Sequence, residues 1–312
     1  MDSKIIEVSD LTKDYGFGRG VFDVSFHVGK GEVFGFLGPN GAGKSTTIRH
    51  LMGFSKPDSG NTKIFGKETF SNYHQILQNV GYIPGEIALP AGLTGHEFLR
   101  MMMDMQHCKD DSHLKKLLDI FELDPSGETK RMSLGVKRKL AVVTAFMNDP
   151  DVLIMDEPTS GLDPEMQQVF IDYVKEEKSR GKTILLSSHI FSEVDATCDR
   201  IAIIKDGRIV SDFVADDLKH ATRKEYEVTF DDSDSYKSFQ EFAKGCDYLE
   251  IIDSNDSKNR LRLVTDDKYI NQVVGALAQY KITGLHHRKE TLEDYFMSYY
   301  KEDKEYGGAF AG

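Results

Sequence analysis

The stretch GPNGAGKST, residues 38–46, determines how the rest of this sequence is interpreted. From Gly38 to Ser45 it matches the pattern G-x-x-x-x-G-K-[ST], and it lies between an apolar run at 32–38 and a helical pattern at 44–52. Its glycines let successive backbone N–H groups converge on one anion, and the N-terminus of the following helix adds positive charge there. The segment therefore predicts a phosphate loop that binds a nucleoside triphosphate.

Each position of this loop has an expected role. Lys44 supplies a positive charge to the β- and γ-phosphates, and the hydroxyl of Ser45 can ligate Mg²⁺. The other expected nucleotide-binding positions are Gly38, Pro39, Asn40, Gly41, Ala42, Gly43 and Thr46. A glycine-rich turn without a ligand is the alternative interpretation, but the Lys-Ser pair between a strand and a helix favours the triphosphate.

Two acids follow a second apolar run, DVLIMDEP at 151–158. Asp156 ends this run, where a buried charge is costly unless it is paired or binds a metal, so we expect Asp156 to help hold Mg²⁺. Glu157 is then placed to polarise a water molecule aimed at the γ-phosphate. An acidic strand end is more often a solvated turn or a helix cap. Combined with a phosphate loop, the catalytic interpretation is preferred.

His189 follows the run TILLSS at 183–188, at the carboxyl end of another predicted strand. Open α/β sheets bind their ligands at this edge, so the imidazole is predicted to hydrogen-bond the γ-phosphate. The alternative is a histidine with a structural role.

The stretch MSLGVKRKL, residues 132–140, predicts a helix that begins near Ser133 and Gly135. The serine hydroxyl and the backbone amides of such a start can cap an anion. One phosphate loop needs no second cap, but a head-to-tail dimer would place this helix start over the γ-phosphate of the partner chain. The segment SGLD at 160–163, which ends in Asp163, is expected at the same interface between the two chains. An ordinary serine-capped helix is the alternative.

Taken in order, these motifs resemble the nucleotide-binding subunits of ATP-binding-cassette (ABC) transporters over residues of about 4–215. The resemblance implies ATP and Mg²⁺ as cofactors, a homodimer that hydrolyses ATP at shared sites, and a transmembrane permease as partner. It also implies a location on the cytoplasmic face of the cell membrane. Tyr15, in LTKDYG, would stack on adenine; an aromatic residue at a strand edge is the alternative.

Two departures from the family pattern are informative. The family signature LSGGQ reads Met132-Ser133-Leu134-Gly135-Val136 here, which keeps the serine and the second glycine. The family glutamine that ligates Mg²⁺ and senses the membrane subunit is replaced by Gly85, which is followed by Glu86. Glu86 either takes over the metal contact or belongs to a surface turn. Such substitutions resemble the ABC-2-type drug and bacteriocin exporters, which implies export.

The first part of the chain alternates strand and helix patterns. Strands are predicted at 5–11, 21–28, 32–38, 80–84, 151–155, 183–188 and 200–210, and helices at 44–52, 94–107, 112–121, 134–147, 164–179 and 190–198. Three nearly continuous apolar runs are typical of parallel strands buried on both faces. The fold class is therefore α/β: a P-loop NTPase of the ABC cassette type over 1–220, with a helical insertion subdomain at about 85–147.

Residues 221–312 are predicted to form an accessory domain with a flexible tail. Its patterns read strand, helix, strand, strand, helix, strand, which indicates a small α+β module of the ferredoxin-like βαββαβ type, followed by an amphipathic helix at 291–300. Regulation, or stabilisation of the dimer, is a further interpretation of this module.

Bulk properties agree with a protein of two domains. The chain has 312 residues, 51 acids against 39 Lys and Arg, and a net charge of −12, which disfavours nucleic acid as a partner. The cysteines Cys108, Cys198 and Cys246 lack metal-type spacing and are expected to be reduced thiols. No run approaches the ~20 apolar residues of a membrane helix, so we expect a soluble chain that reaches a membrane through its partner.

Two questions about partners remain open in the sequence. A soluble ABC-type ATPase acting in translation or DNA maintenance is the alternative function, although one cassette without room for a long coiled coil disfavours it. The segment 93–107 is the expected contact with the membrane subunit, through at least one of Met101, Met102, Met103 and Met105. These methionines could instead pack locally.

Overall fold

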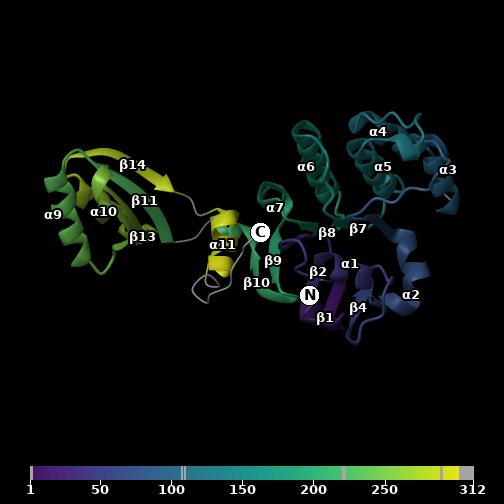
Figure 1. Cartoon of the computed structure of the whole chain (residues 1–312), viewed down its shortest axis with the longest axis horizontal. Helices are drawn as coiled ribbons and strands as arrows, with labels where there is room; N and C mark the ends of the chain where they lie inside the picture. The colour runs from purple at the N-terminus through teal and green to yellow at the C-terminus, as the bar shows by residue number, and fades with distance from the viewer. Residues whose placement is uncertain (1–2, 107, 109, 220–222, 289–290, 302–312) are drawn as a thin grey trace. The chain divides into compact units, whose positions relative to one another are not determined.

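The computed structural model describes residues 3–106, 108, 110–219, 223–288 and 291–301. The chain divides into two compact units, Met1–Ala215 and Asp216–Gly312 (Figure 1). The predicted domain limit at residue 220 and the predicted flexible tail lie outside the described residues. No helix in the described part of the chain has both the length and the apolar character that crossing a membrane requires.

The first unit is built on a six-stranded sheet in the order β10-β9-β3-β8-β7-β6. The strands are β3 (Val33–Leu37), β6 (Val80–Ile83), β7 (Val152–Asp156), β8 (Thr183–Ser188), β9 (Arg200–Lys205) and β10 (Arg208–Val214). The runs β3, β7 and β8 are parallel neighbours and buried throughout, as their apolar sequences predicted. Parallel pairing brings the carboxyl ends of these strands to one edge of the sheet.

The predicted strand at 200–210 is wrong, because it is two antiparallel strands joined by a tight turn. Asp206 and Gly207 both adopt left-handed backbone conformations, with φ of 47° and 74°. An Asp-Gly pair between apolar runs favours such a hairpin, and this signal was overlooked.

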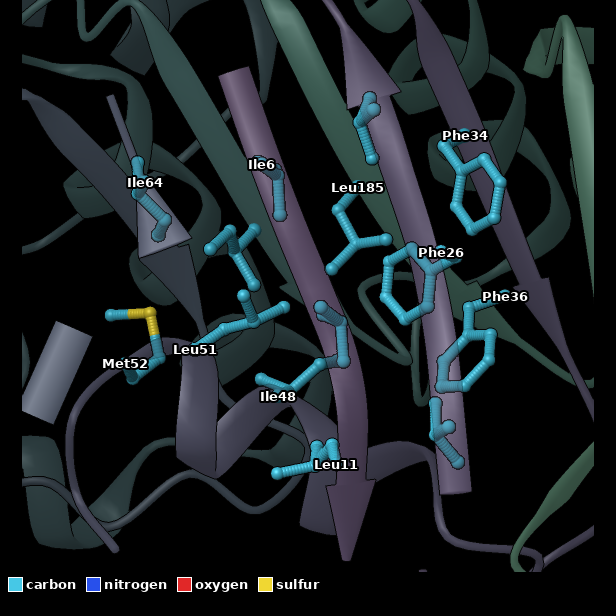
Figure 2. Packing of buried hydrophobic residues seen from close by; sticks show 14 of the residues in the cluster. Ile6, Leu11, Phe26, Phe34, Phe36, Ile48, Leu51, Met52, Ile64 and Leu185 are labelled. Atoms are coloured by element: carbon cyan, nitrogen blue, oxygen red, sulfur yellow. The ribbon is translucent and has the colours of Figure 1, made fainter. Parts of the chain in front are cut away.

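A second, antiparallel sheet has the order β2-β1-β4-β5. Its strands are β1 (Lys4–Asp14), β2 (Gly20–Gly29), β4 (Ser59–Ile64) and β5 (Lys67–Glu68). Apolar side chains fill the space between the two sheets (Figure 2), and the ring of Phe26 stacks on Phe34 at a centroid distance of 5.0 Å. Helix α1 (Lys44–Leu51) joins this core through Ile48 and Leu51, so the helix that follows the phosphate loop is firmly anchored.

The segment between β6 and β7 contains three α-helices, as predicted. They are α3 (Gly95–Met105), α4 (Ser112–Ile120) and α5 (Leu134–Phe146), with a short 3₁₀ turn at Thr129–Arg131, and they gather together in Figure 1. Helix α3 begins at a reciprocal capping box, in which Thr94 and Glu97 bond each other's backbone N–H groups. The other helices of this unit are α2 (Thr69–Ile76), which was not predicted, α6 (Pro164–Ser179) and α7 (Phe191–Thr197).

The second unit has the predicted order of elements. These are β11 (Arg223–Phe230), α9 (Ser233–Lys244), β12 (Glu250–Asn255), β13 (Arg260–Asp266), α10 (Ile270–Leu277) and β14 (Ile282–Arg288), preceded by α8 (Ala215–Lys219) and followed by α11 (Leu292–Lys301). The antiparallel sheet has the order β12-β13-β11-β14. Phe239 of α9 and Val273 of α10 are buried with Leu261 and Leu263 of the sheet, so this unit has its own hydrophobic core.

Candidate active site

The phosphate loop connects β3 to α1 and depends on glycine at several positions. Gly41 and Gly43 have left-handed φ values of 85° and 112°, and Gly43 is the N-cap of α1. A Cβ atom on Gly38 would lie 2.6 Å from the carbonyl oxygen of Ile204. The loop therefore adopts a conformation that side chains at these positions would strain or block, and it leads directly into the helix N-terminus.

Lys44 is buried inside this loop. Its Nζ atom donates to the carbonyl oxygens of Gly38, at 2.6 Å, and Pro39, at 3.3 Å. The same atom lies 3.0 Å from Oε1 of Glu157. The lysine charge is thus held at the loop and neutralised by the carboxylate that the sequence predicted to be catalytic. The next residue, Ser45, is exposed.

The carboxylate pair stands at the end of β7. Asp156 is only 3% exposed, and its Oδ1 accepts a 2.5 Å hydrogen bond from the hydroxyl of Ser187 on the neighbouring strand. Asp156 and Ser187 are direct partners in the register of β7 and β8. Ser187 was missed in the sequence analysis, although its polar side chain directly precedes Ser188 and His189 at a buried strand end.

Glu157 links the predicted catalytic groups. Its backbone has a left-handed φ of 49°, which is uncommon for a residue other than glycine. Oε1 of Glu157 faces Lys44, while Oε2 lies 2.5 Å from Nδ1 of His189. Three residues from separate parts of the sequence therefore meet at the edge of the sheet where the phosphate loop lies. Their roles toward the γ-phosphate and the attacking water stay predictions.

Gly85 lies next to the carboxylate of Asp156. A Cβ atom on Gly85 would lie 2.9 Å from Oδ2 of Asp156, closer than real Cβ contacts allow. Glu86, the following residue, is exposed. The second carboxylate oxygen of Asp156 thus faces the backbone of Gly85 rather than a side chain from that position.

The residues present suit a Mg²⁺ ion bound together with phosphates. A carboxylate from Asp156 and a hydroxyl from Ser45 are hard oxygen donors, and Mg²⁺ is usually held by one or two such protein groups plus substrate oxygens. Within the described residues, no cluster of three or more His, Cys, Asp or Glu side chains could hold a metal on its own.

The signature stretch forms the N-terminus of α5. Ser133 is the N-cap, and its Oγ accepts a 3.3 Å hydrogen bond from the backbone N–H of Val136. A Cβ atom on Gly135 would lie 3.0 Å from the carbonyl oxygen of Gly161, so the helix start packs closely on the SGLD segment of the same chain. Asp163 ends that segment and N-caps α6, accepting from the backbone N–H of Met166 at 2.9 Å.

Two buried charged side chains near the site were not anticipated. Arg138 of α5 contacts the loops that contain Gly85 and Ser160. Glu193 of α7 accepts a 2.6 Å hydrogen bond from the hydroxyl of Ser188. Burial raises the pKa of Glu193 to about 7, although hydrogen bonds from Ser188 and Thr159 oppose the shift. Periodicity offered a signal for Arg138, which falls on the buried face of α5 with Ala141, Val142 and Ala145.

Tyr15 lies in the turn between β1 and β2 and is about half exposed, at 54%. The β2 end of that turn packs on the phosphate loop, because a Cβ atom on Gly43 would lie 2.7 Å from Cγ1 of Val21 and 3.4 Å from the carbonyl oxygen of Gly20. These contacts place the end of the turn, at Gly20 and Val21, against the phosphate loop. Stacking of Tyr15 on adenine stays a prediction.

Comparison with known proteins identifies a family for this architecture. Residues 21–160 match the ABC transporter family. The bacitracin transport ATP-binding protein BcrA of Bacillus licheniformis is 39% identical over 238 residues, covering 74% of this chain and 76% of BcrA. The Nod factor export ATP-binding protein I of Paraburkholderia xenovorans is 36% identical, covering 68% of this chain and 71% of that protein. A solved ATP-binding subunit of an ABC transporter is 33% identical with a TM-score of 0.63, covering 69% of this chain and 92% of its own.

Proposed function

Because the chain belongs to the family of ABC transporter ATP-binding proteins, we propose that it is the ATP-hydrolysing motor subunit of an exporter. In this proposal the chain works as a homodimer, drives a separate transmembrane permease and lies on the cytoplasmic face of the membrane. The single observation that carries the proposal is the meeting of Lys44, Glu157 and His189 at the phosphate loop. Relatives that transport bacitracin or export Nod factors support the direction of transport.

The contacts of Lys44 suggest how ATP binding prepares hydrolysis. Glu157 and two loop carbonyls share the lysine charge in this structure. Phosphate oxygens compete for the same ammonium group, so ATP binding releases Oε1 of Glu157 toward the γ-phosphate. Glu157 then accepts a proton from the attacking water, and His189 holds Glu157 and the γ-phosphate in place.

Ser45 and Asp156 are the residues proposed to hold Mg²⁺. The cation supplies charge neutralisation for the β- and γ-phosphates when it is bound with ATP. Ser187 fixes one oxygen of Asp156, which leaves Oδ2 for the metal or its water ligands. The contribution of Glu86 remains a proposal, and replacing Glu86 with Gln tests it through the Mg²⁺ concentration that gives half-maximal hydrolysis.

The dimer completes each site in trans. Ser133 and Gly135 stand at a helix N-terminus, where hydroxyl and amide groups cap anions, and Asp163 lies in the segment packed against them. We therefore propose that these three residues contact the γ-phosphate of the ATP bound by the partner chain. Residues 1–220 form the ATP-binding domain in this proposal, and 221–312 form an accessory domain.

Helix α3 is proposed to contact the permease. Phe98 and Leu99 on α3 are buried, whereas Met105 at its end is 68% exposed. A flexible thioether on a surface suits docking against a partner helix. Replacing Met105 with Glu should weaken assembly with the permease while leaving ATP binding unchanged, and unchanged assembly would contradict this role.

The test of the proposed function uses Glu157→Gln, which keeps the size of the side chain but removes the base. Purified parent chain should hydrolyse ATP with Mg²⁺, and the variant should lose roughly 10²–10⁴-fold in kcat while forming an ATP-dependent dimer. A variant that remains monomeric with ATP contradicts the shared sites. Capture of the tagged variant from detergent-solubilised membranes should bring a multi-span protein in near-equal amount. Capture of ribosomal or DNA-associated proteins instead would favour the soluble ATPase.

A further inference from the structure

Arg138 of α5 is a cation buried between two loops of the active site. The residue is only 2% exposed. Its guanidinium donates three hydrogen bonds: Nε to the carbonyl of Ser160 at 2.9 Å, Nη1 to Pro84 at 2.8 Å and Nη2 to Gly85 at 2.8 Å. All three acceptors are backbone oxygens, so the contacts constrain the course of the main chain and not merely the side chains.

Burying a charged guanidinium costs more free energy than filling the same space with an apolar side chain. Burial lowers the pKa of Arg138, and only the more distant carboxylates of Asp156 and Glu157 oppose that shift. Apolar residues of similar volume often stabilise a core as well as a buried ion or better. An apolar residue could not replace Arg138 in one respect. The planar guanidinium donates several N–H groups in fixed directions, as a fork, and these join two separate loops at a fixed geometry.

The two loops are both part of the proposed site. Gly85 lies against Oδ2 of Asp156, so the position of its backbone determines the space beside the metal carboxylate. Ser160 precedes Gly161, whose carbonyl oxygen contacts the start of α5 near Gly135. A single side chain thus connects the metal edge of one site with the segment assigned to the partner's γ-phosphate.

We propose that Arg138 is a positioning residue for ATP hydrolysis, which ties the Gly85 loop and the Ser160 loop to helix α5 so that the three move as one body. This inference rests on the proposed function. Separating α5 from either loop would leave a buried guanidinium without its acceptors, which costs more than breaking an exposed contact. The guanidinium of Arg138 bonds only backbone oxygens of these two loops among the hydrogen bonds it makes, so we expect its effect on the placement of Asp156 and Ser160 and not on ATP affinity.

The kinetic test compares Arg138→Met, which removes the donors at similar length, with Arg138→Lys, which keeps the charge but lacks the fork. We expect kcat to fall roughly 100-fold in the first and about 10-fold in the second, because small misplacements of catalytic groups have effects of this size. The KM for ATP should stay within about twofold, because the phosphate loop does not contact Arg138. Lys139→Met, one position along the same helix, is the matched control and should behave like the parent. Equal kcat in Arg138→Met and the parent would overturn the inference.

A second measurement is independent of hydrolysis. Amide hydrogen exchange in the nucleotide-free chain should accelerate together at residues 85–87 and 159–162 in Arg138→Met, with helix α6 unchanged. Uniform acceleration throughout the unit would indicate a general loss of stability, and unchanged exchange in both loops would refute positioning; either result rejects the proposal. Failure of the parent to hydrolyse ATP would instead reject the proposed function, and the exchange result would still decide the role of Arg138.

Discussion

At the residue scale, Glu157 is the side chain that contacts both Lys44 and His189. A left-handed backbone directs its side chain between Lys44 and His189, and a non-glycine residue in that conformation carries about 1–2 kcal/mol of strain. The strain is tolerated because Glu157 is bonded through both its backbone N–H and its carboxylate. If Glu157 is the catalytic base, as proposed, it is already oriented before substrate arrives.

His189 should matter for turnover more than for binding. Replacing His189 with Ala removes the partner of Oε2 of Glu157, so we expect kcat to fall roughly 100-fold with the KM for ATP changed only a few-fold. His74→Ala, at an exposed position on α2, is the control. Steady-state hydrolysis assays on both variants measure the effect, and a His189→Ala enzyme within twofold of the parent would contradict the assignment.

Glu193 should make stability depend on pH. Its pKa is raised by burial from 4.5 to about 7, so below pH 4.5 both folded and unfolded states hold the proton. As pH rises through this window the unfolded state ionises first, and the folded state loses up to about 3 kcal/mol of stability by pH 8. Glu193→Gln cannot ionise.

The variant should therefore gain stability relative to the parent between pH 4 and pH 8. Urea unfolding of both proteins at several pH values measures the difference. A difference that stays constant with pH would show that folding leaves the pKa of Glu193 unchanged.

At the element scale, the contact between β6 and α5 is unusually close. A Cβ atom on Gly81 would lie 2.2 Å from the carbonyl oxygen of Ala145, a backbone atom that cannot rotate away. This contact brings α5 beside the sheet strand that leads to Pro84 and Gly85. The glycine in β6 thus determines how near the signature helix lies to the edge of the sheet where Asp156 stands.

Gly81→Ala should destabilise the first unit by about 2–3 kcal/mol, because overpacking at a rigid backbone contact forces elements apart. Gly127→Ala is the matched control, since a Cβ atom there would meet open space. Chemical denaturation should give a lower midpoint for the first variant with a nearly unchanged slope. Equal midpoints would show that β6 and α5 can separate at little cost.

Strong local signals explain which elements and site residues could be predicted. The runs that became β3, β7 and β8 are mostly apolar, so their burial and parallel pairing followed from composition. Strand β4, with the polar sequence SGNTKI, and the two-residue β5 carry no comparable pattern. Glu157 and His189 were predicted because each directly follows a buried strand, and Lys44 was predicted because it belongs to the phosphate-loop pattern. The bonds of Arg138 reach residues 22 to 54 positions away, and no local pattern encodes such contacts.

At the scale of the whole molecule, each unit buries a core of its own. Phe26 and Phe34 belong to the core between the sheets of the first unit, and Phe239 and Leu263 belong to the core of the second. Units that bury separate cores can unfold separately, so one free energy of unfolding need not describe this chain. The phosphate loop, both carboxylates and His189 all lie in the first unit.

Calorimetry should therefore show two unfolding transitions. ATP with Mg²⁺ should raise the midpoint temperature of only one of these transitions, because a ligand stabilises only the unit that binds it. At a concentration one hundred times Kd, that stabilisation is about 2.7 kcal/mol. A chain ending at residue 220 should retain that transition and its response to ATP. A single transition that shifts as a whole would show that the two units unfold cooperatively.

The close approach of Gly85 to Asp156 also means that these two positions cannot change independently. Any side chain at position 85 would place its Cβ 2.9 Å from Oδ2 of Asp156. The atom in the way is the end of a side chain, so the carboxylate would have to turn aside, against the hydrogen bond that Ser187 donates to its other oxygen. A larger residue at position 85 is therefore compatible with this loop only if Asp156 takes a different orientation.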